Sequence, residues 1–224
     1  MRTRMISTSR SRRPRRPGSG GFTIVELMIA TIIFGMVMLL CMIAVIQVSR
    51  LYYKGITNAR TQDAARSIVD EISNAYKFGD GNITFGFNNN NGSVCIKSQG
   101  IRYSYRIESE IKKTPSTIPA DQQGYHAIWR DTFNGVNCDP LDLSQPTVTG
   151  GGSDGHELLS ENMRVAQFDI NPPDDNGLTT ITVVIITGDN DVLDPNVPNT
   201  CLSSYSGSQF CSVSEITTSV QRRI

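Results

Sequence analysis

The sequence predicts an α+β protein in which a long N-terminal helix packs on a C-terminal antiparallel β-sheet. Two observations carry this prediction. Residues 22–78 contain no proline, whereas from residue 83 onward short β-rich runs alternate with turn residues. A helix followed by a run of strands is typical of an α+β layer arrangement. We therefore divide the chain into a basic leader at 1–21, a long helix at 22–78 and a β-rich head at 79–224.

The first half of the helix, residues 27–46, holds 18 apolar residues and no charge. Twenty such residues match the thickness of a bilayer core, and no other stretch of the chain comes close, so we expect one membrane crossing. Residues 1–21 contain seven arginines and no acid. Basic segments stay on the cytoplasmic side, which places the leader inside and the head outside.

The leader has three other interpretations. A secretory signal would have a shorter apolar run and a small-residue cleavage site, and Ser49-Arg50-Leu51 offers none. The arginine pairs suggest twin-arginine export, which the long apolar run fits poorly. A basic run can also bind nucleic acid, but beside a membrane span it more often sets the topology.

The second half of the helix, residues 47–78, is amphipathic. Its apolar residues fall at helical spacing, and charged residues occupy the other faces. Gly79-Asp80-Gly81-Asn82 then supplies a stop signal. One helix from Thr23 to Lys77 would be about 80 Å long at 1.5 Å per residue. The residues expected to face a core are Ala65, Ile68, Val69, Ile72, Ala75 and Tyr76.

The head is expected to consist of short strands separated by turns. Thr180–Ile186 is the strongest strand by composition, and Pro172–Gly177 before it reads as a hairpin connection. Asn88–Gly92 and Gly150–Ser153 are loops by composition. The expected strands are Ile83–Phe87, Val94–Lys97, Ile101–Glu108, Tyr125–Arg130, Met163–Ile170, Leu178–Thr187 and Glu215–Arg222.

One residue does not fit a plain membrane anchor. Glu26 stands at the start of the apolar run, where a carboxylate at membrane depth costs several kcal/mol unless it is paired or near the interface. Cutting the chain between Gly21 and Phe22 would create an α-ammonium group four residues from Glu26. Such a cut would supply the positive charge that the carboxylate needs.

The segment Gly21-Phe22-Thr23-Ile24-Val25-Glu26-Leu27, after a basic leader and before an apolar helix, resembles the processing motif of type IV prepilins and pseudopilins. The resemblance implies that a prepilin peptidase cuts after Gly21 and methylates the amine of Phe22. It implies that Glu26 pairs with the terminal amine of a neighbouring subunit during assembly. It also implies a pilin-like fold, anchored in the cytoplasmic membrane and then built into a pilus or pseudopilus at the cell surface.

A second, looser resemblance covers about half the chain. A Tyr-rich strand at 101–107 precedes Ile128-Trp129-Arg130, and then come Glu157–Met163 and Val165–Ile170. This order is similar to the outer domain of PilW-like minor pilins and of the J-type pseudopilin. It implies a minor pilin that takes part in pilus assembly or initiation, for motility, adhesion or DNA uptake. The alternatives are a pseudopilin of a type II secretion system and a single-span surface adhesion module that never polymerises.

Of the five cysteines, Cys41 lies inside the apolar run, and four lie in the head, where an oxidising compartment permits disulfides. Four cysteines allow three connectivities. The loop between Cys201 and Cys211 resembles the C-terminal disulfide-bounded region of many pilins, which leaves Cys95 with Cys138. A zinc site is the alternative, but no two of these cysteines have CxxC spacing.

Three carboxylates in one short segment, Asp189, Asp191 and Asp194, suggest a calcium loop. The segment resembles the opening of such a loop, but the later glycine and glutamate positions are not met. The competing interpretation is an acidic turn after a strand. We expect no other cofactor.

Nothing in the sequence predicts an enzyme. His126 and His156 are the only histidines, we expect both in surface turns, and no nucleophile elbow or phosphate-binding loop is present. Without the leader the chain has 14 basic and 21 acidic residues, a formal charge of −7, which argues against a broad nucleic-acid face. A local basic patch remains at Lys112-Lys113 or Arg222-Arg223.

Overall fold

The protein was examined as a computed structural model, which describes residues 21–79, 82–88, 91–107, 125–174, 177–194, 197, 199–202 and 207–223. The chain divides into two compact units, residues 1–46 and residues 47–224. The leader, apart from Gly21, and the Lys112-Lys113 patch lie outside the described residues.

In the first unit, the helix α1 begins at Ile24, and the whole element ends at Lys77. Every described residue of this unit is exposed. Among the described residues, α1 is the one helix that is long and apolar enough to cross a membrane, judged by length and composition. Uncovered apolar side chains on all sides of a helix are typical of a segment whose surroundings are lipid or other apolar helices.

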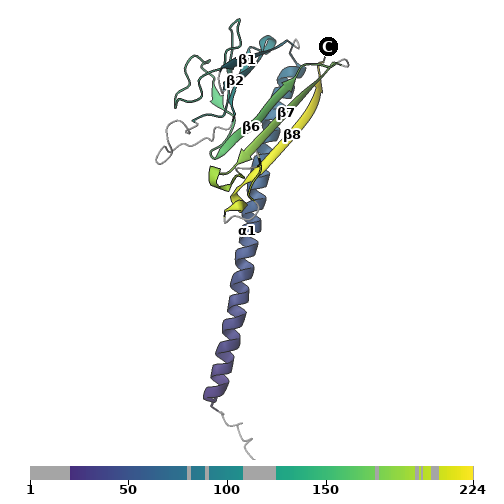
Figure 1. The fold of residues 1–224 in the computed structure, drawn as a ribbon. Helices are drawn as coiled ribbons and strands as arrows, with labels where there is room; N and C mark the ends of the chain where they lie inside the picture. The colour runs from purple at the N-terminus through teal and green to yellow at the C-terminus, as the bar shows by residue number, and fades with distance from the viewer. Residues whose placement is uncertain are drawn as a thin grey trace, which may run out of the picture. The chain divides into compact units, whose positions relative to one another are not determined.

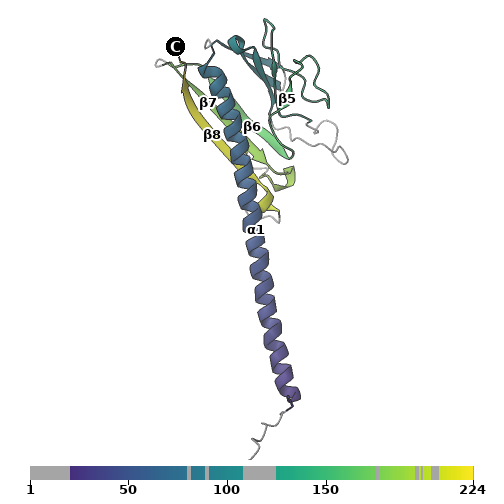
Figure 2. The same cartoon turned by 180° about the vertical axis from the view of Figure 1, so that it is seen from behind.

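In the second unit, α1 buries one face. The expected positions Ala65, Ile68, Val69, Ile72 and Tyr76 are all buried, and Ala75 packs partly against them. This confirms the amphipathic pattern read from the sequence. Figure 2 shows this part of α1 lying along the face of β6, β7 and β8.

The head contains two antiparallel sheets where the sequence suggested one. The first has the order β1-β2-β3-β4-β5, and the second has the order β6-β7-β8 (Figure 1). A parallel bridge between Ile107 and Val165 joins them. The strands are β1 (Ile83–Asn88), β2 (Asn91–Ile96), β3 (Ile101–Arg106), β4 (Ile128–Thr132), β5 (His156–Glu157), β6 (Met163–Asn171), β7 (Leu178–Thr187) and β8 (Ser212–Gln221). Short 3-10 helices are η1 (Lys97–Gln99), η2 (Asn190–Val192) and η3 (Ser208–Phe210).

The second sheet is fastened to α1 by hydrogen bonds at both of its ends. The hydroxyl groups of Thr61 and Thr187 lie 2.7 Å apart, and Thr179 donates to the Tyr76 hydroxyl over 2.8 Å. Apart from Ser73, the buried side chains of α1 between these two contacts are apolar and belong to one core. The spacing of polar and apolar contacts therefore fixes the register of α1 on this sheet.

The first sheet is fastened to α1 by a charged group. Glu71 forms an ion pair with Arg130 of β4, with Nε and Oε1 2.7 Å apart, and the Tyr103 hydroxyl donates to the same oxygen over 3.4 Å. Burial, reinforced by the Glu71 carboxylate, raises the pKa of Tyr103 above its usual range. The phenol therefore remains a donor at any physiological pH.

Several boundaries differ from the sequence prediction for identifiable reasons. Asn91 and Gly92 were expected in a loop but pair with Arg106 and Tyr105 in the ladder. Gly92 is required there because a side chain would overlap the ring of Tyr105. The two-residue strand β5 was not expected, because its ladder partners on β4 are distant in sequence.

The packing of α1 gives a first prediction. Ile68→Ala should lower the free energy of unfolding of the head by about 2–5 kcal/mol, since Ile68 is buried in the shared core. Phe87→Ala is the control, because this side chain is 74% exposed and should change stability by less than about 0.5 kcal/mol. Urea unfolding of the detergent-solubilised chain, followed by Trp129 fluorescence, measures both. Equal effects would contradict the packing described here.

Candidate processing and assembly site

The candidate site lies where α1 begins. Thr23 precedes the first helical residue, and its hydroxyl accepts a hydrogen bond from the Glu26 backbone N–H over 3.2 Å. The Thr23 carbonyl accepts from the Leu27 N–H over 3.1 Å. Thr23 is therefore the N-cap of α1 and Glu26 occupies the third helical position, the spacing of a capping box.

Sequence reasoning missed the role of Thr23. The signal was present, because a threonine three residues before a glutamate and directly before an apolar run predicts a helix start. The cap matters for the site because it positions the Glu26 carboxylate relative to Phe22. The cap fixes residues 23–26 in one conformation, so the distance along the chain from Phe22 to the Glu26 carboxylate is set by a regular helical turn.

The bond predicted to be cut lies immediately outside this cap. Gly21 and Phe22 are non-helical, and the Phe22 side chain is 79% exposed. A Cβ added at Gly21 would meet nothing within 4 Å. The fold of the described residues therefore gives no steric reason for a glycine at this position.

Glu26 carries the only acidic group in the first turn of α1. No ion pair joins its side chain to another described residue. The positive end of the helix dipole favours a carboxylate here, but by less than the several kcal/mol that burial in an apolar environment costs. An ammonium group at Phe22, or at the same residue of another copy, would supply the missing charge.

The head contains the two disulfides that the resemblance implied. Cys95 is bonded to Cys138, and Cys201 is bonded to Cys211, while Cys41 is free and exposed. No described group of three or more His, Cys, Asp or Glu residues is arranged to hold a metal ion. The cysteines are therefore accounted for without the zinc alternative.

The Cys95–Cys138 bond holds an irregular segment, residues 133–155, to the first sheet. A buried ion pair supports the same segment: Arg102 donates to both carboxylate oxygens of Asp131, and its Nη1 donates to the Asp139 carbonyl. Asp131 also accepts from the Gly152 N–H over 2.9 Å. A long loop without regular structure is thus fixed covalently and electrostatically.

The far end of this segment is held by Asp154. Its carboxylate accepts from the hydroxyl and the backbone N–H of Thr132, and these bonds lower the pKa of Asp154. A carboxyl whose pKa is lower in the folded state contributes stability above its unfolded pKa and loses it as the pH falls through the folded one. The attachment is therefore complete at neutral pH.

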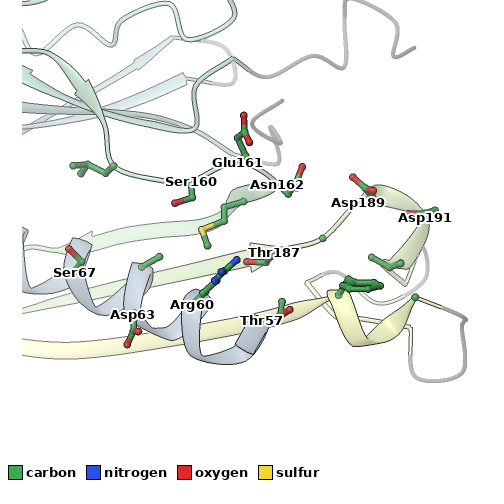
Figure 3. A pocket seen from close by; sticks show the side chains of 17 residues that line it. Thr57, Arg60, Asp63, Ser67, Ser160, Glu161, Asn162, Thr187, Asp189 and Asp191 are labelled. Atoms are coloured by element: carbon green, nitrogen blue, oxygen red, sulfur yellow. The ribbon is translucent and has the colours of Figure 1, made fainter. Parts of the chain in front are cut away.

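The segment predicted to bind calcium borders a groove of about 840 Å³. Asp189 and Asp191 lie at the end of the groove away from Ser67 (Figure 3). The buried Arg164 donates to the Gly188 carbonyl over 2.7 Å, so a guanidinium group already lies at the base of this acidic turn. Together with Asp194, the three aspartates form no such metal-holding group, and calcium binding here stays a prediction.

The two histidines differ in their surroundings. His126 was expected in a surface turn, but its side chain is only 15% exposed and packs edge-on against Trp129. It lies 3.3 Å from Glu157, whose carboxylate also accepts from the N–H groups of Ala127 and Ile128. The expectation for His126 was wrong because Trp129 and Glu157 contact its ring and cover it. His156 is exposed, as expected, and contacts the Asp154 carbonyl.

The cap gives a second prediction. Thr23→Ala should raise the exchange rate of the Glu26 amide hydrogen roughly fivefold, since an N-cap is worth about 1 kcal/mol. Thr31→Ala is the matched control, because the Thr31 hydroxyl donates to the Met28 carbonyl within the helix and caps nothing. Hydrogen exchange of the chain in micelles measures both, and an unchanged Glu26 rate would contradict the assigned cap.

Comparison with known proteins supports this site. Residues 16–42 match the family described as the prokaryotic N-terminal methylation motif. No curated protein and no solved structure gave a significant match to the chain. The motif marks a structural rather than a catalytic family, and it implies processing by a prepilin peptidase, assembly with other pilins and a single membrane anchor. The match, together with the apolar helix and the antiparallel head, supports a type IV pilin-like or pseudopilin protein.

Proposed function

We propose that this protein is a minor type IV pilin, cut by prepilin peptidase between Gly21 and Phe22 and methylated on the new amine. It then takes part in the assembly or initiation of a pilus. It is not an enzyme. Before assembly it is a single-pass protein of the cytoplasmic membrane with its head outside, and afterwards it belongs to the filament at the cell surface.

The observation that carries the proposal is the surroundings of Glu26. Its carboxylate stands in the first turn of a helix whose next twenty residues carry no charge, and it has no ion-pair partner among the described residues. A plain anchor gains nothing from such a group. A subunit that must be placed at one register against another gains a specific contact, because only one cation in the apolar layer can satisfy it.

The mechanism has two stages. Cleavage after Gly21 removes seven arginines and creates the Phe22 amine beside the helix start. The Glu26 carboxylate of one subunit then pairs with the amine of the next, while the apolar first halves of α1 cover one another. The pairing sets the register, and the burial of apolar surface supplies most of the free energy.

Two other functions share parts of this account. A pseudopilin of a type II secretion system would use the same processing and pairing but would not build a long filament. A surface adhesion module would keep the span but would not be processed. We favour a PilW-like minor pilin because the order of the Tyr-rich β3, the Trp129 strand β4 and the segment 157–170 is similar to that group.

Processing gives a third prediction. Gly21→Val should leave the leader attached, because a peptidase that selects glycine before the cut would reject the larger side chain. Gly35→Val is the matched control: a Cβ meets nothing within 4 Å at either glycine, so neither substitution disturbs the described fold. Intact-mass measurement of the membrane-extracted chains separates cut from uncut protein. Normal cleavage of the Gly21→Val chain would contradict the proposed cut.

Pairing gives a fourth prediction. Glu26→Gln keeps the size and removes the charge, so membrane insertion and cleavage should be retained and incorporation into filaments should fall at least tenfold. That factor corresponds to about 1.4 kcal/mol, less than the cost of leaving one charge of a buried pair uncompensated. Glu161→Gln, at an exposed position of the turn before β6, is the control and should assemble normally. Quantitative immunoblots of sheared filaments provide the readout, and equal incorporation would exclude the pairing.

A further inference from the structure

Four large apolar side chains in the second unit are exposed. Each is a neighbour of another member of the group, either in the sequence or in the fold. They are Leu51 at 72%, Tyr52 at 65%, Tyr53 at 51% and Phe210 at 51% exposure, and we call them the aromatic collar. Their position just beyond the apolar run sets them apart from Phe87, which is exposed on the edge strand β1.

The collar is built from two parts of the chain that are distant in sequence. Leu51, Tyr52 and Tyr53 belong to α1, whereas Phe210 ends η3 next to the Cys201–Cys211 disulfide. The ring centroids of Tyr53 and Phe210 are 5.8 Å apart, and those of Tyr52 and Tyr53 are 6.0 Å apart. Phe210 of the head thus adds its aromatic ring to the two tyrosine rings of α1.

Counting along the helix places this cluster. Tyr52 and Tyr53 follow Ile46, the last residue of the apolar run, by six and seven residues, about 9–10.5 Å of helix. The headgroup layer extends roughly 5–7 Å beyond each side of the hydrocarbon core. Side chains on a helix lean toward its N-terminus, so the two tyrosine rings reach back into that layer. Tyrosine is enriched at this depth because its ring is apolar and its hydroxyl is polar.

The charges around the collar match the same layer. From residue 27 to residue 62 the chain has no acidic residue, and its basic residues are Arg50, Lys54 and Arg60. Arg50 and Lys54 flank the collar on either side and are exposed. Lipid phosphates attract such groups, and their long apolar stems lie well along acyl chains. The first acid of the helix after Glu26, Asp63, follows only beyond this segment.

We propose that the aromatic collar lies in the outer headgroup layer of the membrane before assembly and docks the head on the lipid surface. Phe210, at the end of η3, is then the contact of the head with lipid. The collar follows the apolar run of residues 27–46, and the charged residues that flank it, Arg50 and Lys54, are both basic, which favours lipid over a protein partner as its occupant. The inference rests on the membrane anchoring in the proposed function, and not on filament assembly.

The test uses the full processed chain in vesicles of phosphatidylethanolamine and phosphatidylglycerol. Three single variants carry a tryptophan reporter: Phe210→Trp in the collar, Phe34→Trp in the apolar run and Phe87→Trp on β1. The one native tryptophan, Trp129, stays as a constant background. Lipids with a nitroxide on the headgroup quench shallow tryptophans, and lipids with brominated acyl chains quench deep ones. Circular dichroism and protease resistance confirm that each variant folds.

The expected result is a loss of Phe210→Trp fluorescence with headgroup nitroxide and of Phe34→Trp fluorescence with brominated chains, with Phe87→Trp unaffected by either. If Phe34→Trp is quenched and Phe210→Trp behaves like Phe87→Trp, the collar inference is wrong and the membrane anchor stands. If Phe34→Trp is not quenched, the span itself is not inserted, which overturns both. Shielding of Phe210→Trp from aqueous iodide only in assembled filaments would assign the collar to a neighbouring subunit and refute the lipid contact.

Discussion

A single carboxylate at the entrance to an uncharged helix is the constraint on which this account depends. Glu26 lies in the first turn of α1, directly before twenty residues without a charge. In water, an ionised carboxylate at this position has little effect on the free energy of the protein. In lipid or among apolar helices, its burial is unfavourable unless a cation pairs with it. The proposed cut after Gly21 would supply that cation, because it would place an amine at the start of the same helical turn.

The helix that follows has two kinds of surroundings along its length. Its first half has apolar side chains on every side, and its second half buries one stripe against two sheets. Paired threonines and Tyr76 hold the second sheet, and the Glu71–Arg130 ion pair holds the first. The head therefore depends on the same helix that begins next to the candidate processing site. The disulfides and the Arg102–Asp131 pair then fix the loops that have no sheet of their own.

Patterns local in sequence predicted most of the fold. Helical spacing identified the buried face of α1, and β-rich runs identified seven strands within a few residues. Features that depend on contacts between residues distant in sequence could not be predicted. The strand β5 exists only because Glu157 pairs with Trp129. The division into two sheets depends on how the end of β3 meets β6, where Ile107 bridges Val165. His126 was misplaced for the same reason, since its burial is set by Trp129 and Glu157. The candidate site could be predicted because its residues are close together in the sequence. The N-cap at Thr23 also has a sequence signal, the three-residue spacing between Thr23 and Glu26.

The most direct test of the central claim is the mass of the N-terminal peptide of this chain, measured in sheared surface filaments and in the membranes stripped of them. The account predicts a small amount of N-methylated peptide that begins at Phe22 in the filaments. The same peptide found only in the membranes would reassign the chain to a pseudopilin that builds no long filament. An intact leader, residues 1–21, in both fractions would contradict processing and with it the function proposed here.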